Sequence, residues 1–282
     1  MTEQTEQTEG QRVVEPAPGA PLLAPPPLKK ERRALRALLR WTAAVAVFAV
    51  AGGATVYGIT GMKRTDLPGL VTASDGRWEY PPLVKPPLPS GSPGPFAEGN
   101  NAGAHYADLR ALLLPAPEGA TADAALRGTD GWLPTRTFLA EFADRGDRDE
   151  LGQLLTDNGL RHVAARGWNT PDGTHTRIYL LQFDTAAVAD EFLAGKLTDY
   201  NAPRYAVRGA AEVARDDYPV AARVEDVKHQ VFAEVKPYGA EQVREAYLSA
   251  GDTLAMIVQS RKGGAKAVPF QQTIALQSQL LG

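Results

Sequence analysis

The chain has 282 residues, no cysteine and a formal net charge of −3. The lack of cysteine excludes disulfides, thiol catalysis and cysteine-ligated metal sites. Charge is segregated: residues 1–28 hold four Glu and one Arg, residues 29–64 hold eight basic residues and one Glu, and residues 65–282 are net acidic. Because this acidic remainder repels polyanions, we expect no nucleic-acid partner.

Residues 1–28 are rich in Pro, Glu, Gln and Thr and contain few bulky apolar side chains. Burial in such a segment does not offset the conformational entropy of the chain, so we predict a disordered cytoplasmic tail. The proline triplet at residues 25–27 allows a second interpretation, a polyproline ligand for a cytoplasmic partner.

Residues 29–40 form a basic juxtamembrane segment, and residues 41–62 follow without a single charge. As a helix, 22 residues would extend about 33 Å, enough to cross a hydrocarbon core of roughly 30 Å. Six basic residues precede this run and only Lys63 and Arg64 follow it. The positive-inside rule then predicts a single-pass protein of the cell membrane with a cytoplasmic N-terminus.

Two alternatives concern the same segment. The Arg32-Arg33 pair and the small residues at 49–51 resemble, in part, a cleaved export signal, but the region before the apolar core is long for one. Small residues also stand four positions before Gly53 and Gly58. That spacing lets two helices approach closely, so a homodimer through the transmembrane helix stays open.

Residues 63–103 are rich in Pro and Gly and show no apolar periodicity. We predict an extracytoplasmic spacer, followed by a folded domain over residues 104–282. The domain begins with mixed signals: helical spacing runs from Tyr106 to Leu114, and a short helix is expected over 137–143.

A helix, a hairpin and a second helix are predicted next. Leucines at helical spacing end at Asn158-Gly159, a common helix stop. Residues 162–168 and 176–183 flank the turn sequence at 170–173, which contains Pro-Asp-Gly and predicts a β-hairpin that places Trp168 opposite His175. Asp184 is a candidate N-cap for the helix that follows.

The last part of the chain predicts a strand at 227–236, a helix at 241–250, a strand at 254–258 and a final helix that starts near Pro269. This order is typical of an α+β fold. We expect a mainly antiparallel sheet with helices on one face.

Sequence motifs for catalysis are absent. No pair among His105, His162, His175 and His229 has metal-ligand spacing, and no serine lies in a hydrolase signature. The acidic residues at 144–150 are explained by capping of a helix N-terminus. We therefore predict no catalytic residue, no cofactor and no metal.

One set of residues is a candidate interaction surface. Trp168, Tyr179 and His175 lie on the predicted hairpin, where they would form an exposed aromatic patch. Aromatic side chains are more often used in core packing, which is the competing interpretation.

Over the whole chain, the layout of basic tail, apolar span, proline-rich spacer and cysteine-free outer domain resembles single-pass membrane proteins of high-GC bacteria. The resemblance implies no functional residues. The sequence predicts a membrane-anchored extracytoplasmic domain that binds an envelope protein or a small ligand, with the lipid bilayer as the other partner. A membrane-anchored hydrolase with a dispersed site is one alternative, because such sites assemble in space, and an accessory subunit of an envelope complex is the other.

Overall fold

A computed structural model of the chain describes residues 41–43 and 74–282. The predicted tail, the juxtamembrane segment and most of the predicted transmembrane helix lie outside these residues. Within the described ranges, no helix is both long and apolar enough to cross a membrane.

The domain is built on a seven-stranded sheet in which every neighbouring pair of strands is antiparallel, in the order β1-β2-β3-β7-β6-β5-β4. The strands are β1 (Thr121–Ala122), β2 (His162–Asn169), β3 (His175–Gln182), β4 (Val213–Arg215), β5 (Lys228–Glu234), β6 (Glu241–Ala250) and β7 (Thr253–Lys262). The predicted α+β class with a mainly antiparallel sheet is confirmed.

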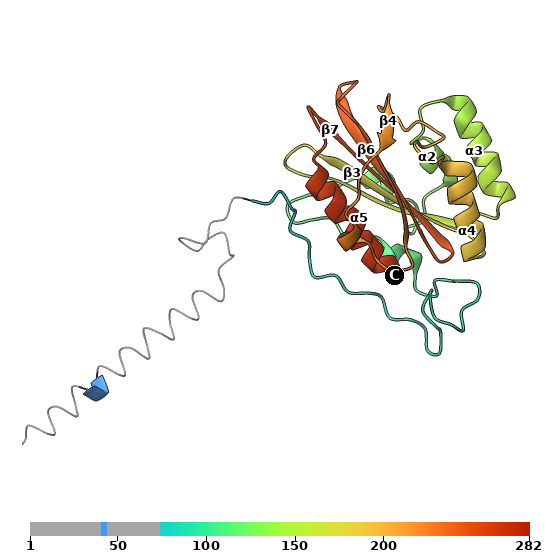
Figure 1. Ribbon diagram of the computed structural model, residues 1–282. Coiled ribbons are helices and arrows are strands. Elements are labelled where there is room, and N and C mark those ends of the chain that lie inside the picture. The colour runs from blue at the N-terminus through green and yellow to red at the C-terminus, as the bar shows by residue number, and fades with distance from the viewer. Residues whose placement is uncertain (1–40, 44–73) are drawn as a thin grey trace, which may run out of the picture. The chain divides into compact units, whose positions relative to one another are not determined.

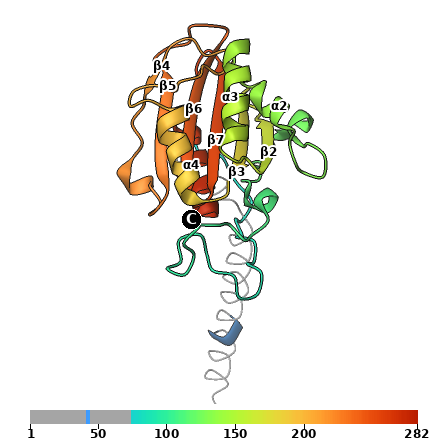
Figure 2. The same ribbon diagram turned by 90° about the vertical axis from the view of Figure 1, so that its right-hand side faces the viewer.

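Helices cover both faces of the sheet rather than one (Figures 1 and 2). The first face carries α2 (Thr135–Leu139), α3 (Arg145–Asp157) and α4 (Ala186–Phe192), and the second carries α5 (Ala267–Leu281). The expectation of a single helical face is therefore wrong. The physical reason is that β3, β6 and β7 are buried on both faces, so each face needs its own cover.

Shorter helical turns complete the fold. They are η2 (Leu109–Leu112), η3 (Ala124–Leu126), η4 (Leu193–Leu197) and η5 (Val220–Ala222). The helix expected between Tyr106 and Leu114 is thus only the single turn η2. The cap of α4 also differs from the prediction, because the side chain of Thr185, not Asp184, accepts from the backbone N–H of Val188.

The predicted hairpin is present as β2 and β3. Gly173 adopts a φ of 83° in its turn, a conformation that glycine tolerates without strain. The register is one residue away from the prediction, since Trp168 pairs with Thr176 and Asn169 pairs with His175. The turn sequence therefore predicted the position of the hairpin correctly. The strand register was not predicted, because it depends on which residues pair next to the turn.

The helix predicted over residues 241–250 is wrong: this segment is the central strand β6. Val243, Ala246 and Tyr247 have helical spacing, yet nearly every residue of the strand is buried. Gly251, with a φ of 52°, forms with Asp252 the two-residue turn into β7, where Ala250 pairs with Thr253. A strand buried on both faces loses the alternation that identifies strands in a sequence.

Residues 63–73 of the predicted spacer lie outside the described residues, and the described part, residues 74–103, contacts the folded domain. The side-chain amide of Gln272 on α5 accepts from the backbone N–H of Trp78 and donates to its carbonyl, both at 2.8 Å. Tyr80 and Leu83 pack on the apolar cluster beneath α5. This proline-rich segment therefore follows an extended path that its apolar side chains fix to α5.

Candidate functional site

Trp168 is a core residue. It is fully buried on the face of the sheet that α5 covers, and its ring meets that of Tyr80 edge to face, with 6.5 Å between the centroids. Tyr179 is buried on the opposite face. The two aromatic residues therefore do not form one exposed patch, and the structure places them in core packing.

The other two hairpin residues belong to one buried polar network. The Tyr179 hydroxyl donates to Oε2 of Glu141 at 2.6 Å, and the Arg177 guanidinium binds the same carboxylate with Nη2–Oε1 at 2.9 Å. Arg177 Nη1 lies 2.8 Å from Nδ1 of His175, whose Nε2 lies 3.0 Å from Oδ2 of Asp123. Five side chains thus connect the core to the sheet edge.

The contacts of His175 define its protonation. Because Arg177 is a donor only, Nδ1 of His175 accepts, and Nε2 carries the proton that is donated to Asp123. Burial lowers the pKa of His175, and the positive charge of Arg177 acts in the same direction. His175 is therefore neutral, with both ring nitrogens engaged.

A second carboxyl group lies on the same face of the sheet. Glu245 on β6 and Arg177 on β3 both flank Val258 of β7 in one cross-strand row. Glu245 is fully buried, and its Oε1 has no hydrogen-bond partner among the described residues. Burial raises its pKa to about 8, so Glu245 is protonated at neutral pH.

His105 and Asp252 form a second buried pair, where the segment before η2 crosses the β6–β7 turn. The two side chains meet at 2.7 Å, and Nε2 of His105 lies 2.9 Å from the carbonyl of Leu281. As in His175, no ring nitrogen is left for a substrate. Neither His–Asp pair has the geometry that proton transfer to a bound molecule requires.

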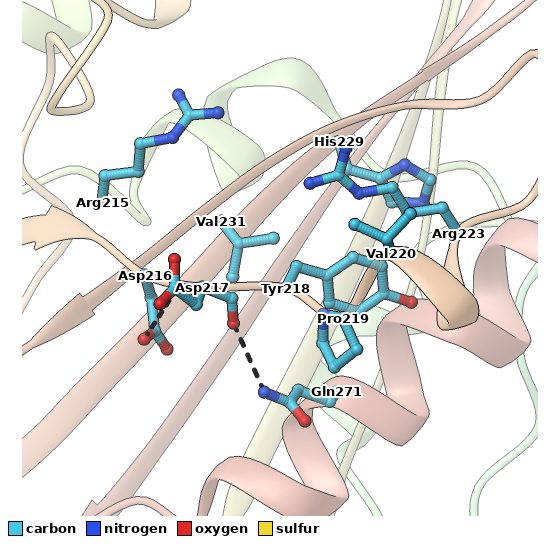
Figure 3. A pocket seen from close by; sticks show the side chains of 10 residues that line it. All are labelled: Arg215, Asp216, Asp217, Tyr218, Pro219, Val220, Arg223, His229, Val231 and Gln271. Carbon is cyan, nitrogen blue, oxygen red and sulfur yellow. Dashed lines mark hydrogen bonds between the residues drawn. The ribbon is translucent and has the colours of Figure 1, made fainter.

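A recess of about 470 Å³ opens at the β4 edge of the sheet (Figure 3). Its floor is the pair of stacked rings of Tyr218 and His229, whose centroids are 5.1 Å apart. Val220 on η5, 75% exposed, forms one wall, and Gln271 of α5 reaches the recess from the opposite side, where its amide donates to the carbonyl of Asp217.

Charges of both signs line this recess. Arg223 and Asp217 are exposed, and among the described residues neither side chain has a salt-bridge partner. In Figure 3 the guanidinium of Arg223 lies beside the His229 ring. Burial lowers the pKa of His229, and the charge of Arg223 adds to the effect. His229 is therefore a neutral ring under a free cation.

The recess also borders an incomplete strand edge. β4 pairs only with residues Phe232, Ala233 and Glu234 of β5. The backbone N–H of Asp216 then donates to the carbonyl of Val231, after which the chain leaves the strand direction. In the described part of the chain, the first half of β5 therefore has a strand partner on one side only, that of β6.

The sequence did not indicate these recess residues. They come from the connector between β4 and β5, from β5 itself and from α5, and no motif links them. Their only signal was a run of charged and aromatic residues around Tyr218 between two strands. Among residues 41–43 and 74–282, no group of three His, Asp or Glu side chains converges as metal ligands would.

No family model matches the chain, and no curated protein matches it either.

Proposed function

We propose that the chain is a membrane-anchored interaction protein whose α+β domain lies outside the cytoplasm and binds an extended segment of an envelope protein in the recess beside β5. The observation that carries this proposal is the combination, in one recess, of an incomplete strand edge with unpaired charges of both signs. The location rests on the charge-free run at residues 41–62 and on the basic residues before it.

An extended polypeptide fits the chemistry of the recess. Its backbone offers alternating donors and acceptors, which add to an open strand edge, while its side chains supply specificity. A carboxylate of the partner would pair with Arg223, a cation with Asp217, and an apolar side chain would cover Val220. An extended polypeptide can therefore contact all the exposed groups of the recess.

Binding is favoured over catalysis by the state of the histidines. In His105 and His175 both ring nitrogens are held by protein groups, so neither offers a general base. The buried Glu141 is likewise occupied by Arg177 and Tyr179. The polar networks stabilise the fold, whereas Arg223 and Asp217 of the recess are free to contact a ligand.

Site-specific photo-crosslinking in the native host tests the binding site. A photoreactive residue at Val220 of the full chain should give a discrete covalent adduct with one envelope protein. The matched control is Val235, which is 80% exposed and follows β5 at its far end, and it should give none. Arg223→Gln should weaken the adduct. Equal labelling at both positions, or none at Val220, would contradict the proposal.

Reporter fusions test the location separately. A reporter that is active only outside the cytoplasm, joined after Gly282, should be active, and a cytosol-only reporter should be silent. Protease added to protoplasts should remove the domain and leave the N-terminal tail. Protection of the domain would contradict the predicted topology, and so would a soluble mature form that begins near Gly52.

A further inference from the structure

A second cavity, of about 310 Å³, lies at the opposite edge of the sheet, where β1 and η2 meet β2. Its size is at the lower end of the range for small-molecule sites, about 300–1,000 Å³. Three arginines line it, Arg110, Arg127 and Arg166, against a single acidic residue, Asp123. Leu113 and three alanines supply apolar wall. The cavity is thus basic within an otherwise acidic domain.

Arg166 is the most deeply set of these cations. It projects from β2, is partly buried, and donates through Nη1 to the carbonyl of Leu113 at 2.7 Å. Among the described residues, no carboxylate lies within ion-pair distance of its guanidinium. Burial lowers the pKa of Arg166, yet an arginine side chain stays protonated in proteins. A desolvated cation with only a carbonyl partner is stabilised by an anion that enters the cavity.

The other two arginines differ in how firmly they are held. Arg110 binds Asp108 with Nη2–Oδ2 at 2.6 Å, donates to the carbonyl of Asp130, and lies 4.9 Å above the ring of Trp132. Arg127 is exposed, and no carboxylate of the described chain pairs with it. Arg110 therefore forms a fixed wall, whereas Arg127 is free to close on a ligand.

The one acidic residue of the cavity, Asp123, is held by hydrogen bonds to other groups. Oδ1 of Asp123 accepts from the backbone N–H of Ala125, and Oδ2 accepts from His175. Its carboxylate is thus engaged on both oxygens and does not pair with Arg127 or Arg166. The positive charge of the cavity is left for a ligand.

Gly131 opens the space that Arg110 occupies. It has a φ of 81°, and a Cβ placed on it would lie 2.8 Å from Cδ of Arg110. Across the cavity, Gly167 of β2 is also hemmed in, because its Cβ would lie 2.6 Å from Cδ1 of Leu126. Both glycines line the cavity, so their backbone N–H groups report directly on its contents.

We propose that this arginine cavity is a binding site for a small organic anion, one that carries a carboxylate or a phosphate on an apolar body. Arg166 and Arg127 bind the anionic group, since a guanidinium matches both anions with paired N–H donors. Leu113 and the alanines contact the apolar body. This site is separate from the recess beside β5 and does not depend on what binds there.

Titrations followed by NMR on the full chain, purified in a mild detergent, test the site. The probes are benzoate and phenyl phosphate, and benzyl alcohol serves as the uncharged match. Both anions should shift the amide signals of Gly131 and Gly167 saturably, and benzyl alcohol should not. The anion with the lower Kd identifies whether the site prefers a carboxylate or a phosphate.

Two variants assign the effect to the arginines. Arg166→Gln should raise the Kd of the preferred anion at least about tenfold. Arg127→Gln should also raise it, and this exposed residue can change without loss of the fold. Arg136→Gln, an exposed arginine on α2 outside the cavity, should leave the Kd unchanged. Absence of saturable shifts, equal shifts with benzyl alcohol, or unchanged binding by both cavity variants would overturn the proposal.

Discussion

His105 Nδ1 lies 2.7 Å from Oδ1 of Asp252, and side-chain exposure is only 3% and 1% for the two residues. Asp252 also accepts from Thr253 and Gln182, while His105 reaches the C-terminal turn of α5 through the carbonyl of Leu281. The pair therefore ties the segment before η2, the β6–β7 turn and the last helix together.

Replacement of His105 should destabilise the domain strongly. His105→Phe leaves the carboxylate of Asp252 buried without its main partner, and loss of one member of a buried pair costs about 3–5 kcal/mol. The free energy of unfolding in urea measures the effect. His162→Phe is the matched control, because His162 is exposed, and it should change stability by less than about 0.5 kcal/mol. Equal effects of the two changes would contradict a stabilising role for the His105–Asp252 pair.

Glu245→Gln should stabilise the protein in a pH-dependent way. The pKa of Glu245 is raised to about 8 in the folded protein, above the ordinary value of 4.5. The folded state therefore binds the proton of Glu245 more tightly than the unfolded state does. The contribution of Glu245 to stability is complete below about pH 4.5 and is lost as the pH rises through about 8. At pH 7 to 8 the variant should gain about 3–4 kcal/mol.

The same comparison below pH 4.5 is the control for Glu245. There the carboxyl group is protonated in both folded and unfolded chains, and Gln should give little gain. Urea unfolding at several pH values measures this difference. A gain that does not depend on pH would mean that packing, not ionisation, distinguishes the two side chains.

Arg177 and Glu141 should show strong coupling in a double-mutant cycle. Either Arg177→Met or Glu141→Gln leaves a buried charge without its partner and should cost about 3–5 kcal/mol, and the double variant should cost less than the two single changes together. The pair Arg204–Asp199, with side-chain exposure of 45% and 64%, is the control and should couple by less than about 1 kcal/mol. Comparable coupling energies for the two pairs would contradict the stronger interaction expected of the buried pair.

Trp168 should matter for stability through its volume and not through its N–H group. Trp168→Ala removes a fully buried ring and should cost about 3–5 kcal/mol. Trp168→Phe should cost clearly less, because Nε1 of Trp168 has no hydrogen-bond partner among the described residues. Thermal melting measures both. A stable alanine variant would contradict the buried position.

The sequence predicted local features better than those that depend on the third dimension. The hairpin of β2 and β3 followed from a turn that needs only Pro171, Asp172 and Gly173, and α3 followed from its leucine spacing. β6 was misassigned because its neighbours on both sides bury even Glu245, which removes any alternating pattern. Whether helices cover one or both faces of the sheet depends on tertiary packing, which a short sequence segment does not reveal.

Both candidate binding sites were beyond reach of the sequence. Arg110, Arg127 and Arg166 stand far apart along the chain, and only the path of η2 and β1 around the edge of β2 brings them to one cavity. The hairpin residues His175 and Tyr179 were predicted to lie on an exposed surface, but their side chains contact other parts of the chain instead. Their partners, Asp123 and Glu141, come from other elements and could not be paired in advance.

The two hydrogen bonds between Gln272 and the backbone of Trp78 have a mechanical consequence. They fasten the start of the domain to α5, the last helix of the chain. A pull applied ahead of residue 74 therefore acts on these two hydrogen bonds to α5 before it reaches the rest of the segment. The side chain of Gln272 is thus the first point at which the folded domain resists such a pull.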